Sequence, residues 1–181
     1  MKKLPAWLAV LLLVLGLGLV APSTASAAPY CGITWGSQAK TKSLMVQSPI
    51  INVRSGRHAC FDRLVVDLKG KAPGYTVRYV KTVHAEGSGK AIPLRGAADL
   101  SITVRAPAYN SAGKATYVPK NRKELVNLAG YRTFRQAAWG GSFEGVTTIG
   151  LGVRARLPFR VFTLKGQNNV SMLVIDVAHR W

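Results

Sequence analysis

The chain has 181 residues, with 25 Lys and Arg against seven Asp and Glu, so its formal net charge is +18 at pH 7. Hydrophobic residues make up 48% of the sequence, which excludes an intrinsically disordered chain and is enough for a packed core. Seven carboxylates, three His and two Cys leave few groups for catalysis once structural needs are met. After the first 22 positions, no apolar run is long enough to span a membrane.

The first 27 residues have the order of a secretory signal peptide. Two lysines near the start are followed by an apolar run from Leu8 to Val20 and then by small residues up to Ala27. We therefore expect export, with cleavage after Ala27 or Ala28 and no membrane span afterwards; a transmembrane anchor is the less favoured alternative. Cleavage after Ala27 leaves 154 residues (181 − 27) with a net charge of +16 (23 − 7).

Both cysteines, Cys31 and Cys60, lie after the predicted cleavage site. An even number of cysteines in an exported protein favours a disulfide, because the compartment is oxidising. We predict a Cys31–Cys60 bond that closes a loop of 30 residues (60 − 31 + 1). Chain entropy assigns such a bond about 3 to 4 kcal/mol of stability. A closed zinc site is disfavoured, since no His cluster accompanies the two thiols.

Alternation of apolar and polar residues is the dominant pattern of the remaining chain, and Gly, Pro and Asn turns separate the alternating runs. It predicts strands, in chain order, at 64–68, 75–79, 100–104, 149–157 and 173–177. Strands with one apolar face indicate an all-β antiparallel fold, either a sandwich of two sheets or a closed barrel. Residues 107–123 are long for a hairpin loop, and one or two helical turns are expected at 121–128. No linker divides residues 28–181, so we expect a single domain.

Several stretches resemble a known family. Arg63–Gly70 (RLVVDLKG) has the form of an AMIN-domain strand, and Phe159–Leu164 (FRVFTL) with Met172–Val177 (MLVIDV) is similar to the way such domains end. The chain more closely resembles secreted AMIN-like proteins of high-GC Gram-positive bacteria. The stretches that carry this resemblance are Tyr30–Ser37, Gly56–Arg63, Tyr131–Gln136, Trp139–Gly145 and Ala178–Trp181.

The resemblance implies a fold, a location and a partner. AMIN domains are antiparallel β-sandwiches of two small sheets, and in cell-wall amidases and outer-membrane secretion proteins they target peptidoglycan or the envelope without being catalytic. By this resemblance, residues 28–181 form one AMIN-like domain of a secreted or envelope-located protein that is not an enzyme. Its expected partner is a cell-wall polymer, either peptidoglycan or an anionic polysaccharide, and another exported protein is a further possibility.

The arginines indicate binding to a polyanion, because a guanidinium matches carboxylate and phosphate groups bidentately. Arg154 and Arg156 are expected on the polar face of one strand and Arg105 on that of another, which together predict a basic sheet face. Trp139, next to Gly140, is the aromatic residue expected to form an exposed platform for sugar rings, although burial is the commoner role of Trp. The candidate ligand-binding residues are Arg105, Arg132, Arg135, Trp139, Arg154 and Arg156. Export argues against nucleic acid as the partner.

Catalytic motifs are weak throughout. Ser142 lacks a nucleophile elbow, because Glu144 stands where the second glycine is needed. His58, His84 and His179 have no metal-ligand spacing, and Gly150-x-Gly152 precedes no helix that would complete a dinucleotide site. We therefore expect no catalytic residue, no metal and no cofactor.

Two alternatives to a binding module remain open. A small secreted wall hydrolase would use Asp67, Asp176 or Glu144, because glycosidases need two carboxylates at the scissile bond. Ion pairing of Asp67 and Asp176 with neighbouring arginines is the favoured interpretation. A protein-interaction module would dock another exported protein through residues 107–123.

Overall fold

The computed structural model describes residues 29–181, so the predicted signal peptide lies outside the described residues. The elements are η1 (Tyr30–Gly32), β1 (Lys40–Lys42), β2 (Ile50–Arg57), β3 (Phe61–Lys69), β4 (Gly74–Val80), β5 (Val83–His84), β6 (Ala91–Ile92), β7 (Ala98–Arg105), β8 (Phe134–Phe143), β9 (Val146–Val153), β10 (Phe159–Lys165) and β11 (Val170–Ala178). The predicted all-β antiparallel fold is confirmed.

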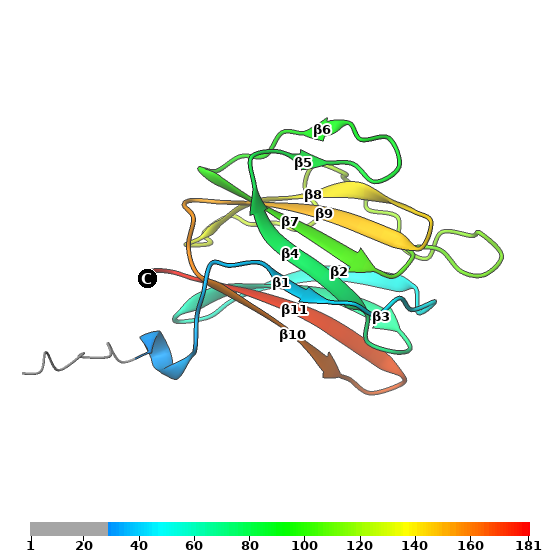
Figure 1. Cartoon of the computed structure of the whole chain (residues 1–181), viewed down its shortest axis with the longest axis horizontal. Helices are drawn as coiled ribbons and strands as arrows, with labels where there is room; N and C mark the ends of the chain where they lie inside the picture. Colours follow the sequence, from blue (N-terminus) through cyan, green and yellow to red (C-terminus); the bar gives the residue numbers. More distant parts are fainter. Residues whose placement is uncertain (1–28) are drawn as a thin grey trace, which may run out of the picture.

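Two sheets lie face to face and form a sandwich (Figure 1). One has the strand order β1-β4-β7-β9-β8, and the other has the order β10-β11-β3-β2. Alternate residues of each strand point into the space between the sheets, because side chains in a strand point to opposite faces. The buried rows include Leu64, Val66 and Leu68 of β3, Leu173, Ile175 and Val177 of β11, Leu100, Ile102 and Val104 of β7, and Ile149, Leu151 and Val153 of β9.

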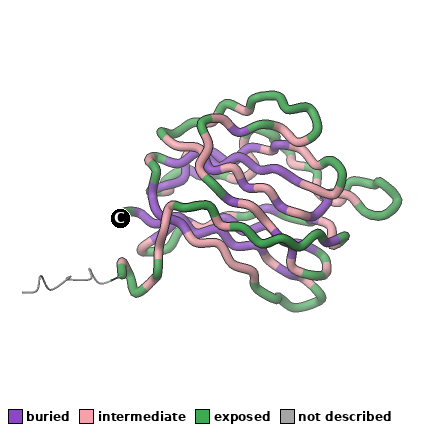
Figure 2. Tube along the Cα trace, viewed as in Figure 1, coloured by how far each residue is buried: buried purple, intermediate pink, exposed green. Residues whose placement is uncertain are grey.

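These rows explain why the sequence forms these strands. Each buried Leu, Ile or Val side chain contributes about 1.5 to 3 kcal/mol to stability relative to leaving it exposed. A shift of one residue in the pairing of two strands would turn a whole row of these side chains toward solvent, so the pairing register is strongly specified. Figure 2 shows the buried residues concentrated between the two sheets, with the connecting loops exposed. The alternation read from the sequence therefore corresponds to the core faces of β3, β4, β7, β9 and β11.

Two sequence predictions were wrong in detail. The strand predicted at 149–157 ends at Val153, because its neighbours end there: Val153 pairs with Ala98 at the start of β7 and with Phe134 at the start of β8. No helical turn forms at 121–128 within the described chain. Instead, the backbone N–H of Leu125 donates to Ala137 and the carbonyl of Arg122 accepts from the N–H of Trp139, so this segment covers the edge of β8.

A small hairpin of β5 and β6 lies over the outer side of the five-stranded sheet (Figure 1). Gly150 and Gly152 of β9 make this approach possible. A Cβ atom at Gly152 would lie 2.0 Å from the carbonyl oxygen of Arg95, and one at Gly150 would lie 3.1 Å from Leu94. The Gly-x-Gly sequence therefore serves the close packing on the sheet of Leu94 and Arg95, which follow the hairpin.

The predicted disulfide between Cys31 and Cys60 is confirmed, with their Cα atoms 6.5 Å apart. It joins the η1 segment to the residue directly before β3. The backbone N–H of Phe159 donates to Gly36, which fixes the same segment along the start of β10. The disulfide therefore holds the N-terminal segment against the four-stranded sheet.

Candidate functional site

Of the three carboxylates considered for hydrolysis, Asp67 and Asp176 are in ion pairs, and Glu144 forms none within residues 29–181. Asp67 accepts hydrogen bonds from Arg54 at 2.8 and 3.1 Å, and Asp176 pairs with Arg63 and Arg160. In the pairing of β3 with β11, Asp67 lies opposite Met172, four residues along β11 from Asp176. The two carboxylates are therefore not placed as an acid and base around one bond, and the predicted structural role of both is confirmed by their arginine partners.

Ser142 is fully engaged in structural hydrogen bonds. Its Oγ accepts from the backbone N–H of Ala108 at 2.9 Å and lies 2.9 Å from Thr147 Oγ1. Thr147 in turn donates to the carbonyl of Ala106 at 2.8 Å. Ser142 therefore joins β8, β9 and the loop that follows β7, and no His side chain is among its hydrogen-bond partners within residues 29–181.

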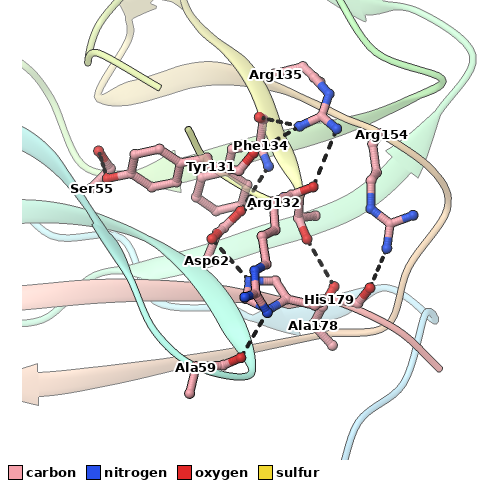
Figure 3. Close-up of polar contacts among 11 residues, drawn as sticks. Ser55, Ala59, Asp62, Tyr131, Arg132, Phe134, Arg135, Arg154, Ala178 and His179 are labelled. Atoms are coloured by element: carbon pink, nitrogen blue, oxygen red, sulfur yellow. Dashed lines mark hydrogen bonds and ion pairs between the residues drawn. The ribbon is translucent and has the colours of Figure 1, made fainter. Parts of the chain in front are cut away.

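Asp62 and His179 form a buried network at one end of the sandwich (Figure 3). Asp62 Oδ1 lies 3.1 Å from Nε2 of His179, and Oδ2 accepts from the backbone N–H groups of Thr133 and Phe134 at 2.6 and 3.1 Å. The other ring nitrogen of His179 lies 3.2 Å from the carbonyl oxygen of Ala59. The Asp62 side chain is 1% exposed and that of His179 is 8% exposed. Because the pair is buried, we interpret it as a structural contact that connects β3, the start of β8 and the end of β11.

Three of the predicted arginines lie around this network (Figure 3). Arg135 donates to the carbonyls of Tyr131, Arg132 and Phe134, and Arg154 donates to the carbonyl of His179. The side chains of Arg135 and Arg154 therefore stabilise backbone segments at this end of the sandwich. Arg132 is exposed and lines a pocket of about 260 Å³ with Arg57, and its guanidinium makes no hydrogen bond within the described chain.

Arg105 and Arg156 do not contact the network of Asp62 and His179, and the arginines do not share one sheet face as predicted. Arg156 follows the end of β9 and lies 4.9 Å from the ring centre of Tyr79. Arg105 ends β7, seven residues from Ala98, which pairs with Val153. At about 3.3 Å per residue, Arg105 is about 23 Å along the sheet from the Arg154 end.

Trp139 lies in a concave surface lined by four aromatic side chains, here called the Trp139 groove. The groove has a volume of about 640 Å³ and follows the edge of β8, between the turn of the β5–β6 hairpin and the loop after β7. Its lining residues are Glu86, Gly87, Ser88, Ala108, Tyr109, Gly113, Ala115, Tyr117, Arg122, Trp139, Gly141, Ser142 and Phe143.

The rings of the Trp139 groove are held in place. Trp139 and Tyr117 contact each other edge to face with ring centres 5.3 Å apart, and Phe143 is 52% exposed. The hydroxyl of Tyr109 accepts a hydrogen bond from the N–H of Gly145 at 2.8 Å. Burial raises the pKa of Tyr117, so its phenol stays neutral and can donate a hydrogen bond.

The charged residues that line the groove are Arg122 and Glu86, one of each sign. Arg122 is exposed and forms no ion pair within residues 29–181, while Lys114 lies between the lining residues Gly113 and Ala115. Glu86 accepts a hydrogen bond from Thr148 Oγ1 at 2.8 Å. Aromatic surfaces next to guanidinium and ammonium groups can stack on sugar rings and attract negatively charged substituents.

Sequence reasoning identified Trp139 but not its neighbours. Tyr109, Tyr117 and Arg122 come from residues 107–123, a segment considered as a long loop that docks another protein and not as a polymer-binding surface, and Phe143 ends β8. The available signal was the pair of tyrosines, Tyr109 and Tyr117, in that loop. Which strand edge that loop covers depends on contacts between distant parts of the chain.

No three His, Cys, Asp or Glu side chains in the described part of the chain are grouped so that they could hold a metal ion. Among residues 29–181, no helix has the length and apolar character needed to cross a membrane.

Comparison with protein families gives one match, in which the model of the AMIN-like domain matches residues 48–179. This range includes β2 to β11, the network of Asp62 and His179, and the whole Trp139 groove. Comparisons with curated proteins and with solved structures find no match.

Proposed function

The chain belongs to the AMIN-like domain family, and we propose that residues 28–181 are an exported, non-catalytic module that binds an anionic polymer of the cell wall. AMIN-like domains are typically peptidoglycan-associated modules of the cell envelope and are generally non-catalytic. Family membership also suggests an extracytoplasmic or envelope location. The proposal adds a polymer class and a binding surface to these general properties.

The observation that carries the proposal is the Trp139 groove. It combines the rings of Trp139, Tyr117 and Phe143 with the guanidinium of Arg122, which has no carboxylate partner among the described residues. A glycan that carries carboxylate or phosphate groups offers both the ring faces and the negative charge that this surface complements. The groove is open to solvent, which suits a chain-like ligand better than a small enclosed one.

The overall charge supports the same ligand class. Asp67, Glu124 and Asp176 are already held in ion pairs with arginines, and Asp62 is held in the buried contact with His179. Their partners include four arginines, so 19 of the 23 Lys and Arg in residues 29–181 form no ion pair within that described range (23 − 4). We propose that Arg105, Arg132, Arg135, Arg154 and Arg156 contribute to this long-range attraction, while the Trp139 groove makes the contacts.

The test is co-sedimentation of the exported protein with purified cell walls over a series of salt concentrations. The walls are used intact and after removal of their phosphate-bearing polymers. We expect binding that weakens with salt and falls about 5- to 150-fold in Trp139→Ala, because stacking of a ligand ring on one aromatic side chain is worth about 1 to 3 kcal/mol. Trp181→Ala is the matched control, since Trp181 is 69% exposed and lies outside the groove.

Each outcome has a distinct meaning. Loss of binding on stripping the walls identifies the phosphate-bearing polymer as the ligand, and retention identifies peptidoglycan. Equal binding by the Trp139→Ala and Trp181→Ala variants would remove the groove as the contact surface. Absence of binding to either preparation would overturn the proposed function.

A further inference from the structure

The outer face of the four-stranded sheet contains a second cationic site, formed where β3, β10 and β11 lie side by side. Asp176 of β11 has a fully buried side chain, and two arginines pair with it. Arg63 donates from Nε at 2.6 Å and from Nη2 at 2.8 Å, and Arg160 donates from Nε at 2.8 Å. Two guanidinium groups on one carboxylate leave the cluster with a net positive charge.

Aromatic rings fix the guanidinium of Arg160 on several sides. Its central carbon lies 5.5 Å from the ring centre of Trp35, 5.3 Å from that of Phe61 and 5.0 Å from that of Phe162. Arg63 also lies over Phe61 and Phe162, at 5.2 and 5.5 Å. Such contacts hold a guanidinium in one orientation before any ligand arrives, which lowers the entropic cost of binding.

Arg160 has donors left over after it has paired with Asp176. Only its Nε is used, and its two Nη atoms make no hydrogen bond within residues 29–181. The side chain of Arg160 is 32% exposed and that of Arg63 is 23% exposed, so both can be reached from solvent. A fixed pair of Nη donors next to aromatic walls matches the two oxygens of a carboxylate or a phosphate.

We propose that Arg160, supported by Arg63 and Asp176, is a binding site for a single oxyanion, the carboxylate or phosphate group of a ligand. Trp35 and Phe162 form its walls. The site lies on the outer side of the four-stranded sheet, whereas the Trp139 groove follows the edge of the five-stranded sheet, so the two are independent.

The disulfide contributes to this site. Trp35 belongs to the N-terminal segment that Cys31–Cys60 holds against the start of β3, and its indole N–H donates to the carbonyl of Tyr30 at 2.8 Å. Trp35 also packs against Phe61 with ring centres 5.9 Å apart. Reduction of the disulfide should therefore loosen one wall while leaving the Arg63–Asp176 pair in place.

The experiment is a nuclear magnetic resonance titration of the protein purified after export of the full-length chain. Inorganic phosphate and acetate are added separately at constant ionic strength, with chloride as the balancing anion. The Nε–H signals of the arginines and the indole N–H of Trp35 are followed. We expect saturable shifts of the Arg160 and Trp35 signals, with a dissociation constant in the millimolar range.

Three variants make the test specific. Arg160→Gln should abolish the saturable shift, and it should still fold because Asp176 keeps both hydrogen bonds from Arg63. Arg160→Lys keeps the charge but loses the paired donors, so we expect affinity about tenfold lower. Arg78→Gln is the control of matched charge, because Arg78 is exposed on β4 and should leave the shifts unchanged.

The outcomes separate the two ligand sources. Saturation with phosphate alone identifies a phosphate-bearing ligand, and saturation with acetate alone identifies a carboxylate-bearing one. Shifts that grow linearly for all arginines alike, or that persist in Arg160→Gln, would overturn the proposal. Trp139→Ala should leave the titration unchanged, so a failure of the groove and a failure of this site are distinguishable.

Discussion

Asp62 and His179 lie 117 positions apart in the sequence, and their side chains meet in the interior at 3.1 Å. Asp62 is the second residue of β3, and His179 directly follows β11. The same carboxylate accepts the backbone N–H groups of Thr133 and Phe134 at the start of β8. One buried side chain therefore holds together a strand of each sheet and the end of the described chain.

Replacing Asp62 by Ala should lower the free energy of unfolding by about 3 to 5 kcal/mol, because it leaves His179 and two buried N–H groups without their partner. Asp67→Ala is the matched control. Its partner Arg54 is 50% exposed, so we expect a loss of about 1 kcal/mol or less. Urea denaturation of both variants measures the difference. Equal losses would show that Asp62 does not join the two sheets.

The strands that alternate cleanly could be predicted from the sequence, and β8 could not. In β3, β7 and β11 every second residue is a large aliphatic side chain, so the buried face is visible. In β8, Ala137, Ala138, Gly140 and Gly141 replace large residues, and the pairing with β9 shifts between Trp139 and Ser142. Small residues and a bulge remove the period that identifies a strand.

The basic face failed as a prediction for a physical reason. Arg154 and Arg156 continue the alternation of β9, but β7 and β8 provide no partners beyond Val153, so the strand cannot continue. The Arg160 site could not be predicted from the sequence either, because its residues come from β3, β10, β11 and the N-terminal segment. Which arginines gather depends on strand order, and alternation alone does not determine strand order.

Arg122→Gln should weaken wall binding and lower the slope of log affinity against log salt by about one, the change expected for one lost ionic contact. The double variant Arg154→Gln and Arg156→Gln should weaken binding only at low salt, since these residues act at a distance that salt screens. Co-sedimentation across a salt series measures both slopes. A larger loss in the double variant than in Arg122→Gln would place the contact at the Arg154 end of the sandwich.

Removal of the disulfide by Cys31→Ser with Cys60→Ser should cost about 3 to 4 kcal/mol of stability, the chain-entropy value for a 30-residue loop. The two sheets do not depend on the bond for their pairing, so the variant should still fold, with the signals of Trp35 broadened or shifted. Thermal unfolding and the indole N–H spectrum measure the two effects. Unchanged Trp35 signals would show that the contacts of Gly36 with Phe159 alone hold the segment.

Tyr79 makes stability depend on pH in the alkaline range. Its hydroxyl donates to the carbonyl of Leu157 at 2.7 Å and accepts from the N–H of Leu157 at 3.0 Å. Burial raises the pKa of Tyr79 from 10.0 to about 12. The folded protein therefore keeps the phenol proton where the unfolded chain loses it, and this contribution is complete below about pH 10 and is lost as the pH rises to about 12.

Tyr79→Phe should therefore be less stable than the unsubstituted protein by about 1 to 3 kcal/mol at neutral pH, because the backbone N–H and C=O of Leu157 lose their partner. Between pH 10 and pH 12 the difference should shrink, since only the protein with Tyr79 has this phenol to ionise on unfolding. Urea denaturation at intervals from pH 8 to pH 12 measures the difference in stability, and absorbance at 295 nm follows phenolate formation. A difference that stays constant over this range would show that Tyr79 ionises equally in the folded and unfolded states.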